Sequence, residues 1–141
     1  GRSFEPKGDY DLHVVNFKTA VHSGSWSMSN PLLLEIGHTY PWIYGVMIHP
    51  DQAKRKGVSD GDEIWIESEY GYRVKGKVCV TEGIHLDCIG VSGVGGRLAY
   101  GEPVGRKEGP SWNVLFGQHL DNMDKMNSSL DSAIRVKIYK A

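Results

Sequence analysis

The stretch from Lys18 to Asn30 holds most of the groups in this chain that could contact a polar ligand. It offers one cation, one imidazole, several hydroxyls, the Trp26 indole and backbone amides around Gly24. Hydroxyls and N–H groups donate to phosphate oxygens, and an indole stacks on a heteroaromatic ring. The stretch therefore suits a ligand that carries phosphates and a ring, although an ordinary serine-rich surface loop has the same composition.

A second candidate is Asn113, which follows Trp112 in the apolar segment 110–117. A side-chain amide among apolar residues needs hydrogen-bond partners, since burying it unpaired is costly. Either a ligand edge or a local turn could supply those partners.

Other groupings lack the spacing that their chemistry requires. The glycine-rich run 90–96 is not followed by a helical pattern, which a dinucleotide fingerprint needs. The six histidines and two cysteines show no zinc spacing. Asp60 and Asp62 lack the remaining ligands of a calcium loop and indicate a turn. We therefore predict no metal site in this chain, and we expect Cys79 and Cys88 to be buried packing residues.

The elements that must position these residues are short strands joined by turns. Alternation over Tyr72–Val80, with Ile64 and Ile66 on one face of the preceding run, predicts a hairpin. Asp51 to Gly57 predicts a two-turn helix with Asp51 as its N-cap or first-turn carboxylate and Gly57 as a left-handed C-cap. Further strands are expected at 12–17, 88–91 and 134–139, a second helix at 30–36, and irregular chain at 18–30, 38–45 and 92–109. About six or seven strands with two small helices predict a mainly β fold, a closed barrel or a sandwich.

Composition excludes several classes of protein. The 141 residues suit one domain, and 40% hydrophobic residues suffice for a core. A net charge of −1 gives no electrostatic case for nucleic acid. No apolar run is long enough for a transmembrane helix. The chain begins at Gly1 without an initiator Met, and we interpret it as a domain excised from a larger protein.

An ordered set of residues resembles one family, the C-terminal molybdopterin-dinucleotide-binding domain of the molybdenum and tungsten oxidoreductases related to dimethyl sulfoxide reductase. The set spans residues 10–140. It consists of His22-Ser23 and Ser25 after the first strand, the short helix from Asn30, Pro50-Asp51, Ala53, Gly57, Asp60-Gly61-Asp62, Gly71 and Asn113-Val114-Leu115.

This resemblance implies a double-psi β-barrel, similar to aspartate decarboxylase. It also implies a cofactor, molybdopterin guanine dinucleotide, whose molybdenum or tungsten is held by the full-length enzyme, so that this chain binds without catalysing. By position, the cofactor-binding residues would be Lys18, His22, Ser23, Gly24, Ser25, Trp26 and Asn113. Lys18 stands where many relatives carry Arg, and a Lys keeps the charge but loses the bidentate fork.

The expected organisation is a flexible N-terminal segment or cloning remnant at 1–9 and a barrel domain at 10–141. The resemblance implies upstream domains of the same subunit as partners, with an iron–sulfur electron-transfer subunit as a further candidate, and no nucleic acid. It points to a parent that reduces sulfur or arsenic oxyanions. Two alternatives stay open: a pyruvoyl decarboxylase on the same barrel, which would cleave itself at Gly24-Ser25, and a non-catalytic adaptor barrel.

Overall fold

The computed structural model describes residues 7–101, 104–124, 126, 128–130 and 132–141. The elements are β1 (Leu12–Phe17), η1 (Ser25–Ser29), α1 (Pro31–His38), α2 (Pro41–Tyr44), β2 (Val46–Ile48), α3 (Pro50–Lys56), β3 (Glu63–Ser68), β4 (Arg73–Val80), β5 (Cys88–Ser92), η2 (Trp112–Leu115), η3 (Leu120–Asn122) and β6 (Arg135–Lys140), where η marks a 3₁₀ helix. Most of the N-terminal segment expected to be flexible, residues 1–6, lies outside the described residues.

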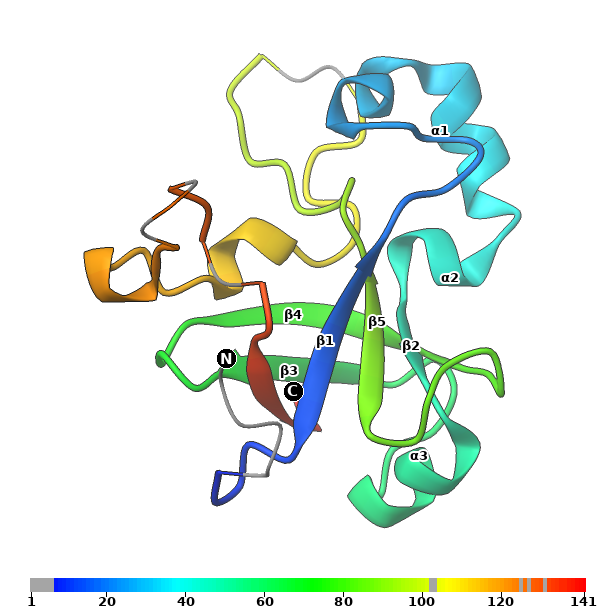
Figure 1. Cartoon of the computed structure of the whole chain (residues 1–141). Coiled ribbons are helices and arrows are strands. Elements are labelled where there is room, and N and C mark those ends of the chain that lie inside the picture. Colours follow the sequence, from blue (N-terminus) through cyan, green and yellow to red (C-terminus); the bar gives the residue numbers. More distant parts are fainter. Residues whose placement is uncertain (1–6, 102–103, 125, 127, 131) are drawn as a thin grey trace.

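Six strands close into a barrel in the order β1-β5-β2-β4-β3-β6 (Figure 1). β1 runs parallel to β5 and β2 runs parallel to β4, whereas the other four neighbouring pairs are antiparallel. Parallel neighbours cannot be joined by a hairpin, so other elements lie in the sequence between β1 and β5 and between β2 and β4. The predicted closed β-barrel is confirmed, and its long connections are 18–45, between β1 and β2, and the chain that follows β5.

The hairpin of β3 and β4 has the faces that its alternation predicts. Ile66 pairs with Val74 across the two antiparallel strands. Ile64 and Val78 also point inward and are 0% and 3% exposed. Because side chains alternate between the two faces of a strand, these positions fill the barrel while their neighbours meet solvent.

Helix α3 begins and ends where the sequence indicates. His49 is its N-cap and accepts a hydrogen bond at Nδ1 from the backbone N–H of Asp51, at 3.2 Å. Pro50 occupies the first helical position, where no N–H is needed. Gly57 ends the helix in the left-handed region, with φ 65°. Only a residue without a Cβ adopts that conformation at little cost.

Three local expectations are wrong. The stretch 38–45, expected to be irregular, contains α2, which a proline starts and tertiary contacts stabilise. Residues 18–30, expected to have no regular structure, contain η1. Cys79 and Cys88 are half-buried rather than buried. A one-turn helix has no periodicity to detect, and a half-buried strand position looks like a buried one in sequence.

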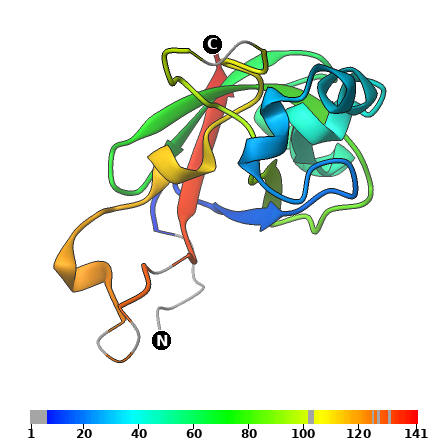
Figure 2. The same ribbon diagram turned by 90° about the horizontal axis from the view of Figure 1, so that it is seen from above.

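The connections after β1 and β5 leave the barrel side by side. Phe17 pairs with Ser92 at the ends of these parallel strands, and the N–H of Gly93 donates to the carbonyl of Phe17 at 3.1 Å. We call residues 18–45, 93–101 and 104–111 the loop lobe. In Figure 1 the loop lobe lies above the strands, with α3 at the opposite end. Figure 2 shows that η3 lies apart from it, beside the barrel.

Candidate functional site

The stretch 18–30, which we call the ligand loop, belongs to the loop lobe, and most of its polar side chains are exposed. Lys18 Nζ donates to the carbonyl of Ser23 at 3.2 Å and so spans the base of the loop. Ser23 and Ser25 are exposed, and the Trp26 side chain is 85% exposed. The indole lies over the backbone at Gly24, because a Cβ built there would be 3.0 Å from Trp26 Nε1. The loop therefore offers hydroxyls and an indole face to one side.

Several backbone N–H groups of the same loop are not used in hydrogen bonds to the described residues. Among the described residues, none accepts from the N–H groups of Ser23, Gly24, Ser25 or Trp26. The Gly24 carbonyl, by contrast, accepts from both the N–H and the hydroxyl of Ser27, at 3.3 and 2.7 Å. The Gly24 carbonyl is thus satisfied within the loop, whereas these consecutive donors have no acceptor among the described residues. Such an arrangement favours an anionic ligand such as a phosphate.

His22 lies behind this loop, inside the protein. Its ring is 0% exposed, with Nδ1 2.8 Å from Ser27 Oγ and Nε2 2.6 Å from the Tyr44 hydroxyl. Burial lowers the pKa of His22 below its ordinary value. Of the predicted site residues, His22 is the one whose side chain the structure directs away from solvent, because both ring nitrogens bond to other residues of this chain.

Tyr44 links the loop to the rest of the loop lobe. Its hydroxyl lies 3.3 Å from the carbonyl of Leu34 in α1, and its ring meets the His38 ring edge-on at 5.0 Å. Burial and the nearby Glu108 carboxylate raise the pKa of Tyr44 to about 12. The hydroxyl is therefore protonated throughout the neutral range and can act as a hydrogen-bond donor.

Residues 93–101 and 104–111 fasten the ligand loop from the other side. Arg97 Nη1 donates to the carbonyl of Ser25 at 2.6 Å. Gly105 packs so closely that a Cβ there would be 2.5 Å from the carbonyl oxygen of Met28. The ligand loop is therefore held by the connection that follows β5, which is far from it in sequence.

Asn113 lies in η2, at the edge of the apolar segment. Leu115 is 0% exposed, and Trp112 packs edge-on against Phe116 with ring centroids 4.9 Å apart. Asn113 itself is exposed, and its amide bonds to no described residue. The expectation that this amide must be satisfied inside an apolar segment is wrong, because η2 turns it to solvent. In Figure 1, η2 (golden) lies on the same side of β4 as the loop lobe, and Gly96 packs against Ser111, two residues before Asn113.

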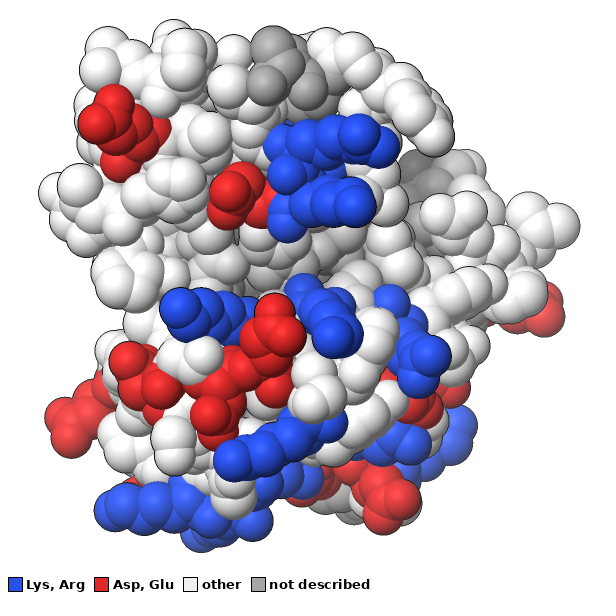
Figure 3. All heavy atoms as spheres, turned by 180° about the vertical axis from the view of Figure 1, so that it is seen from behind, with Lys and Arg blue, Asp and Glu red and all other residues white. Residues whose placement is uncertain are grey.

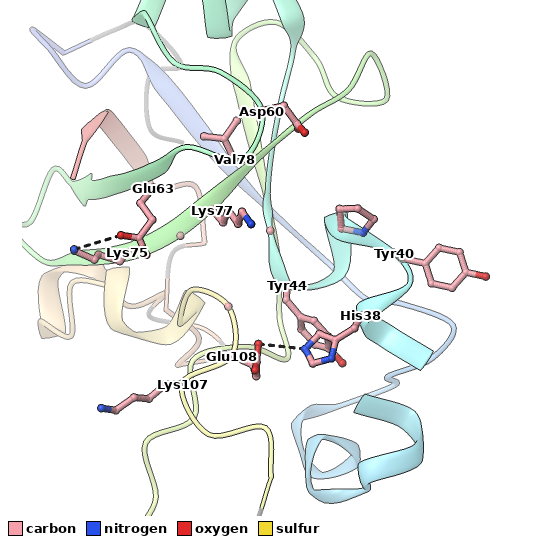
Figure 4. A pocket seen from close by; sticks show the side chains of 15 residues that line it. His38, Tyr40, Tyr44, Asp60, Glu63, Lys75, Lys77, Val78, Lys107 and Glu108 are labelled. Atoms are coloured by element: carbon pink, nitrogen blue, oxygen red, sulfur yellow. Dashed lines mark ion pairs between the residues drawn. The ribbon is translucent and has the colours of Figure 1, made fainter. Parts of the chain in front are cut away.

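A cavity of about 630 Å³ lies on another face of the loop lobe. It is bounded by α2, by β4 and by residues 107–109, and Figure 4 shows His38 facing Glu108 across its edge. His38 Nε2 and Glu108 Oε2 are 3.4 Å apart, and Lys75 lies 3.9 Å from Glu63. In Figure 3 a hollow crosses this face with basic side chains on both sides. Nothing in the sequence singled out this cavity, since the residues that line it come from distant segments.

The cavity contains none of the predicted site residues, but Tyr44 forms part of its wall and also bonds to His22. Its positive and negative side chains balance, so its charge selects no particular ligand.

Among the described residues, no three His, Cys, Asp or Glu side chains lie close enough together to hold a metal ion. Within the same residues, no helix has the length and apolar character needed to cross a membrane.

Comparison with solved structures identifies the class of fold. The chain superimposes on acetylene hydratase from Pelobacter acetylenicus with a TM-score of 0.73 and 19% sequence identity, over 95% of this chain and 19% of that one. At this level of identity the likeness shows the fold alone. It agrees with the double-psi β-barrel that the resemblance implied, which the two parallel strand pairs of the closed barrel fit.

Sequence comparison then identifies the family. The model of the molydopterin dinucleotide binding domain matches residues 12–132, and the chain belongs to this family. It is also 34% identical over 122 residues to the thiosulfate reductase molybdopterin-containing subunit PhsA of Salmonella typhimurium. The matched region covers 86% of this chain and 14% of that protein. The chain therefore spans a small part of the relative's length. The family decides against the pyruvoyl decarboxylase and the adaptor barrel, and it identifies the cofactor as a molybdopterin.

Proposed function

We propose that the exposed side of residues 23–26, together with Asn113, forms a half-site for molybdopterin guanine dinucleotide within a larger enzyme. One observation carries the proposal: four consecutive backbone N–H groups, which have no acceptor among the described residues, lie next to an indole that is 85% exposed. Donors of this kind fit phosphate oxygens, and an exposed indole fits a heteroaromatic ring. The chemistry of the residues therefore fits the cofactor that the family binds.

The predicted residues take different roles in this half-site. Ser23, Gly24 and Ser25 supply amides and hydroxyls, and Trp26 supplies a stacking surface. Lys18 already donates to the Ser23 carbonyl, so it contributes a nearby positive charge and braces the loop. Its single ammonium group provides this charge without the bidentate geometry of an Arg. Asn113 offers a free amide to the pterin.

The proposed arrangement of the parent follows from the relative. We propose that residues 10–141 form the barrel domain and that upstream domains of the same subunit close the other side of the cofactor. We further propose a parent that reduces a sulfur oxyanion, because the relative is named as a thiosulfate reductase subunit, with an iron–sulfur subunit as electron partner. The cofactor's metal, molybdenum or tungsten, would supply the two-electron chemistry, and this chain would supply binding.

The test compares cofactor retention in the parent enzyme after exposed residues are truncated. Trp26→Ala and Asn113→Ala should each lower the bound pterin, measured by fluorescence after release. Leaving one cofactor polar atom unpaired in a dry site costs about 1–3 kcal/mol, or roughly five- to 150-fold in affinity. Guanine released on hydrolysis identifies the nucleotide, and elemental analysis identifies the metal.

Matched controls keep this test specific. Leu120 has the same 85% exposure as Trp26 but lies in η3, and Gln118 is an exposed amide outside the proposed half-site. Leu120→Ala and Gln118→Ala should retain the cofactor. Equal retention in all four variants would overturn the proposed half-site.

A further inference from the structure

A row of short polar contacts runs from α2 to the ligand loop through the interior of the loop lobe. The Tyr44 hydroxyl lies 2.6 Å from His22 Nε2, and His22 Nδ1 lies 2.8 Å from Ser27 Oγ. Ser27 Oγ in turn lies 2.7 Å from the carbonyl oxygen of Gly24. Four groups are thus linked in series, and the ring at their centre is fully buried.

Two proton arrangements are possible when the ring is neutral, and they differ in the bonds that they use. In the first, Ser27 donates its single hydroxyl proton to the Gly24 carbonyl, which only accepts. Ser27 then accepts from His22, which requires the ring proton to be on Nδ1. Nε2 is left as an acceptor, so the Tyr44 hydroxyl donates to it. In the second arrangement Ser27 donates to Nδ1, Nε2–H donates to Tyr44, and Tyr44 donates to the carbonyl of Leu34 at 3.3 Å. The first arrangement is favoured because it keeps the 2.7 Å bond from Ser27 to Gly24.

We propose that His22 is a positioning residue for the ligand loop, acting as the Nδ1–H tautomer in a one-way hydrogen-bond chain from Tyr44 through Ser27 to the Gly24 carbonyl. This inference deepens the proposed function and, for its effect on the cofactor, rests on it. The His22 ring does not touch the cofactor. It holds the Gly24 carbonyl inward, which leaves the neighbouring backbone N–H groups free to face a ligand.

The surroundings of the ring favour its neutral form. The ring is removed from water, and the contacts of His38 of α1 and Glu108 of the 104–111 segment are with Tyr44. A protonated ring would donate from both nitrogens. Nε2–H would then donate to the Tyr44 oxygen, the Tyr44 proton would turn to the carbonyl of Leu34 at 3.3 Å, and the chain would no longer run one way.

A glycine in α1 provides independent support for this chain. A Cβ at Gly37 would collide with the hydroxyl oxygen of Tyr44. The absence of a side chain at Gly37 therefore leaves room for the Tyr44 hydroxyl in the position where it contacts His22. The backbone of His22 is also held in place, because its N–H donates to Thr19 Oγ1 at 2.9 Å.

The first experiment measures the tautomer in this chain without any cofactor. Nitrogen-15 NMR at neutral pH should show His22 with its proton on Nδ1 and an unprotonated Nε2. In Tyr44→Phe, which keeps the aromatic ring and removes the donor, the Nε2 resonance should shift and the tautomer should become mixed. Tyr72→Phe, on the exposed side of the β3–β4 turn, should leave the spectrum unchanged. A proton on Nε2 in the wild-type chain would overturn the proposal.

The second experiment measures bound cofactor in the parent enzyme. Ser27→Ala and His22→Leu break the chain and should lower cofactor retention several-fold, whereas His22→Asn keeps a donor near the place of Nδ1 and should restore part of it. If Trp26→Ala loses cofactor but Ser27→Ala and His22→Leu do not, the positioning role is overturned and the half-site stands. If none of the three loses cofactor while the tautomer is as expected, the half-site itself is overturned.

Discussion

The barrel and the loop lobe are built on different principles. The barrel closes through continuous strand pairing around apolar side chains such as Ile64, Ile66 and Val46, each 0% exposed. The loop lobe has few such residues and is joined by single contacts, among them Arg97 to Ser25 and His22 to Tyr44. Its surface also exposes large side chains, including Trp26 and Tyr100, at 85% and 95%.

This difference separates stability from recognition. Apolar burial is non-directional and adds up over many residues, so the barrel tolerates changes at any one surface position. A hydrogen bond depends on one donor and one acceptor, so each contact in the loop lobe can be lost with a single substitution. Loops held on a rigid scaffold are where binding residues concentrate. The predictions that follow test this division, from the largest expected effect to the smallest.

Hydrogen exchange should show the largest contrast between the two regions in the isolated chain. Amides of residues 18–29 and of the described parts of 92–109 should exchange orders of magnitude faster than those of β3 and β4, because local opening costs much less than global unfolding. Exchange followed by mass spectrometry measures the contrast. Protection of the loop lobe equal to that of the hairpin would show that the two regions unfold as one unit.

Truncation inside the barrel should cost the most stability of any single change considered. Ile64→Ala should lower the free energy of unfolding by roughly 2–5 kcal/mol, since it removes a fully buried side chain and leaves a cavity. Urea denaturation measures the loss. Val15 lies on β1 but is 41% exposed, so Val15→Ala is the control, with a change within about 0.5 kcal/mol. A loss below about 1 kcal/mol for Ile64→Ala would contradict the assigned face.

A change in the loop lobe should cost less and act locally. Gly37→Ala places a methyl group against the Tyr44 hydroxyl and should lower stability by about 1–3 kcal/mol. The displaced hydroxyl should also free the ligand loop, so exchange should quicken at 22–27 but stay slow in β3. Gly83→Ala, in an exposed turn with its nearest contact at 3.3 Å, is the control. Faster exchange in β3 would mean that the barrel depends on this contact.

The same division explains what the sequence could predict. The bounds of β1, the inward faces of β3 and β4, and the first turn and C-cap of α3 follow from local patterns: alternation, the Asp51 carboxylate and Gly57 at the helix end. These signals lie within a few residues of the element they define. The closed barrel then follows from the number and type of elements.

The internal arrangement of the site could not be predicted in the same way. His22 and Tyr44 are 22 residues apart, and neither lies in a periodic pattern. Their contact depends on α2, a single turn that its sequence did not indicate. Asn113 was singled out for being polar among apolar residues, but the turn of η2 places its amide in solvent. Contacts between connections depend on the closed barrel that brings them together, and no local pattern records that.

The smallest expected effect is the pH dependence of the free energy of unfolding. It should differ between the loop lobe and the barrel. Burial holds the pKa of His22 below its ordinary value of about 6.5, so the unfolded chain takes up this proton first as the pH falls. The stabilisation is therefore complete above about pH 6.5 and is lost as the pH falls through the folded pKa. Glu67 belongs to the barrel, and hydrogen bonds from Lys137 and then Tyr139 hold its pKa below the usual range, so its share is lost only in more acidic solution.

Urea denaturation at about pH 7.5 and about pH 5.5 separates the histidines from the carboxylates, since a carboxylate of ordinary pKa stays ionised at both values, and substitution of His22 then assigns its share. The wild-type chain should be less stable at the lower pH, and His22→Asn should reduce the difference. His85→Asn is the control, because this side chain is 74% exposed and lies in a turn of the barrel. A pH difference that persists unchanged in His22→Asn would show that the acid sensitivity arises outside the loop lobe.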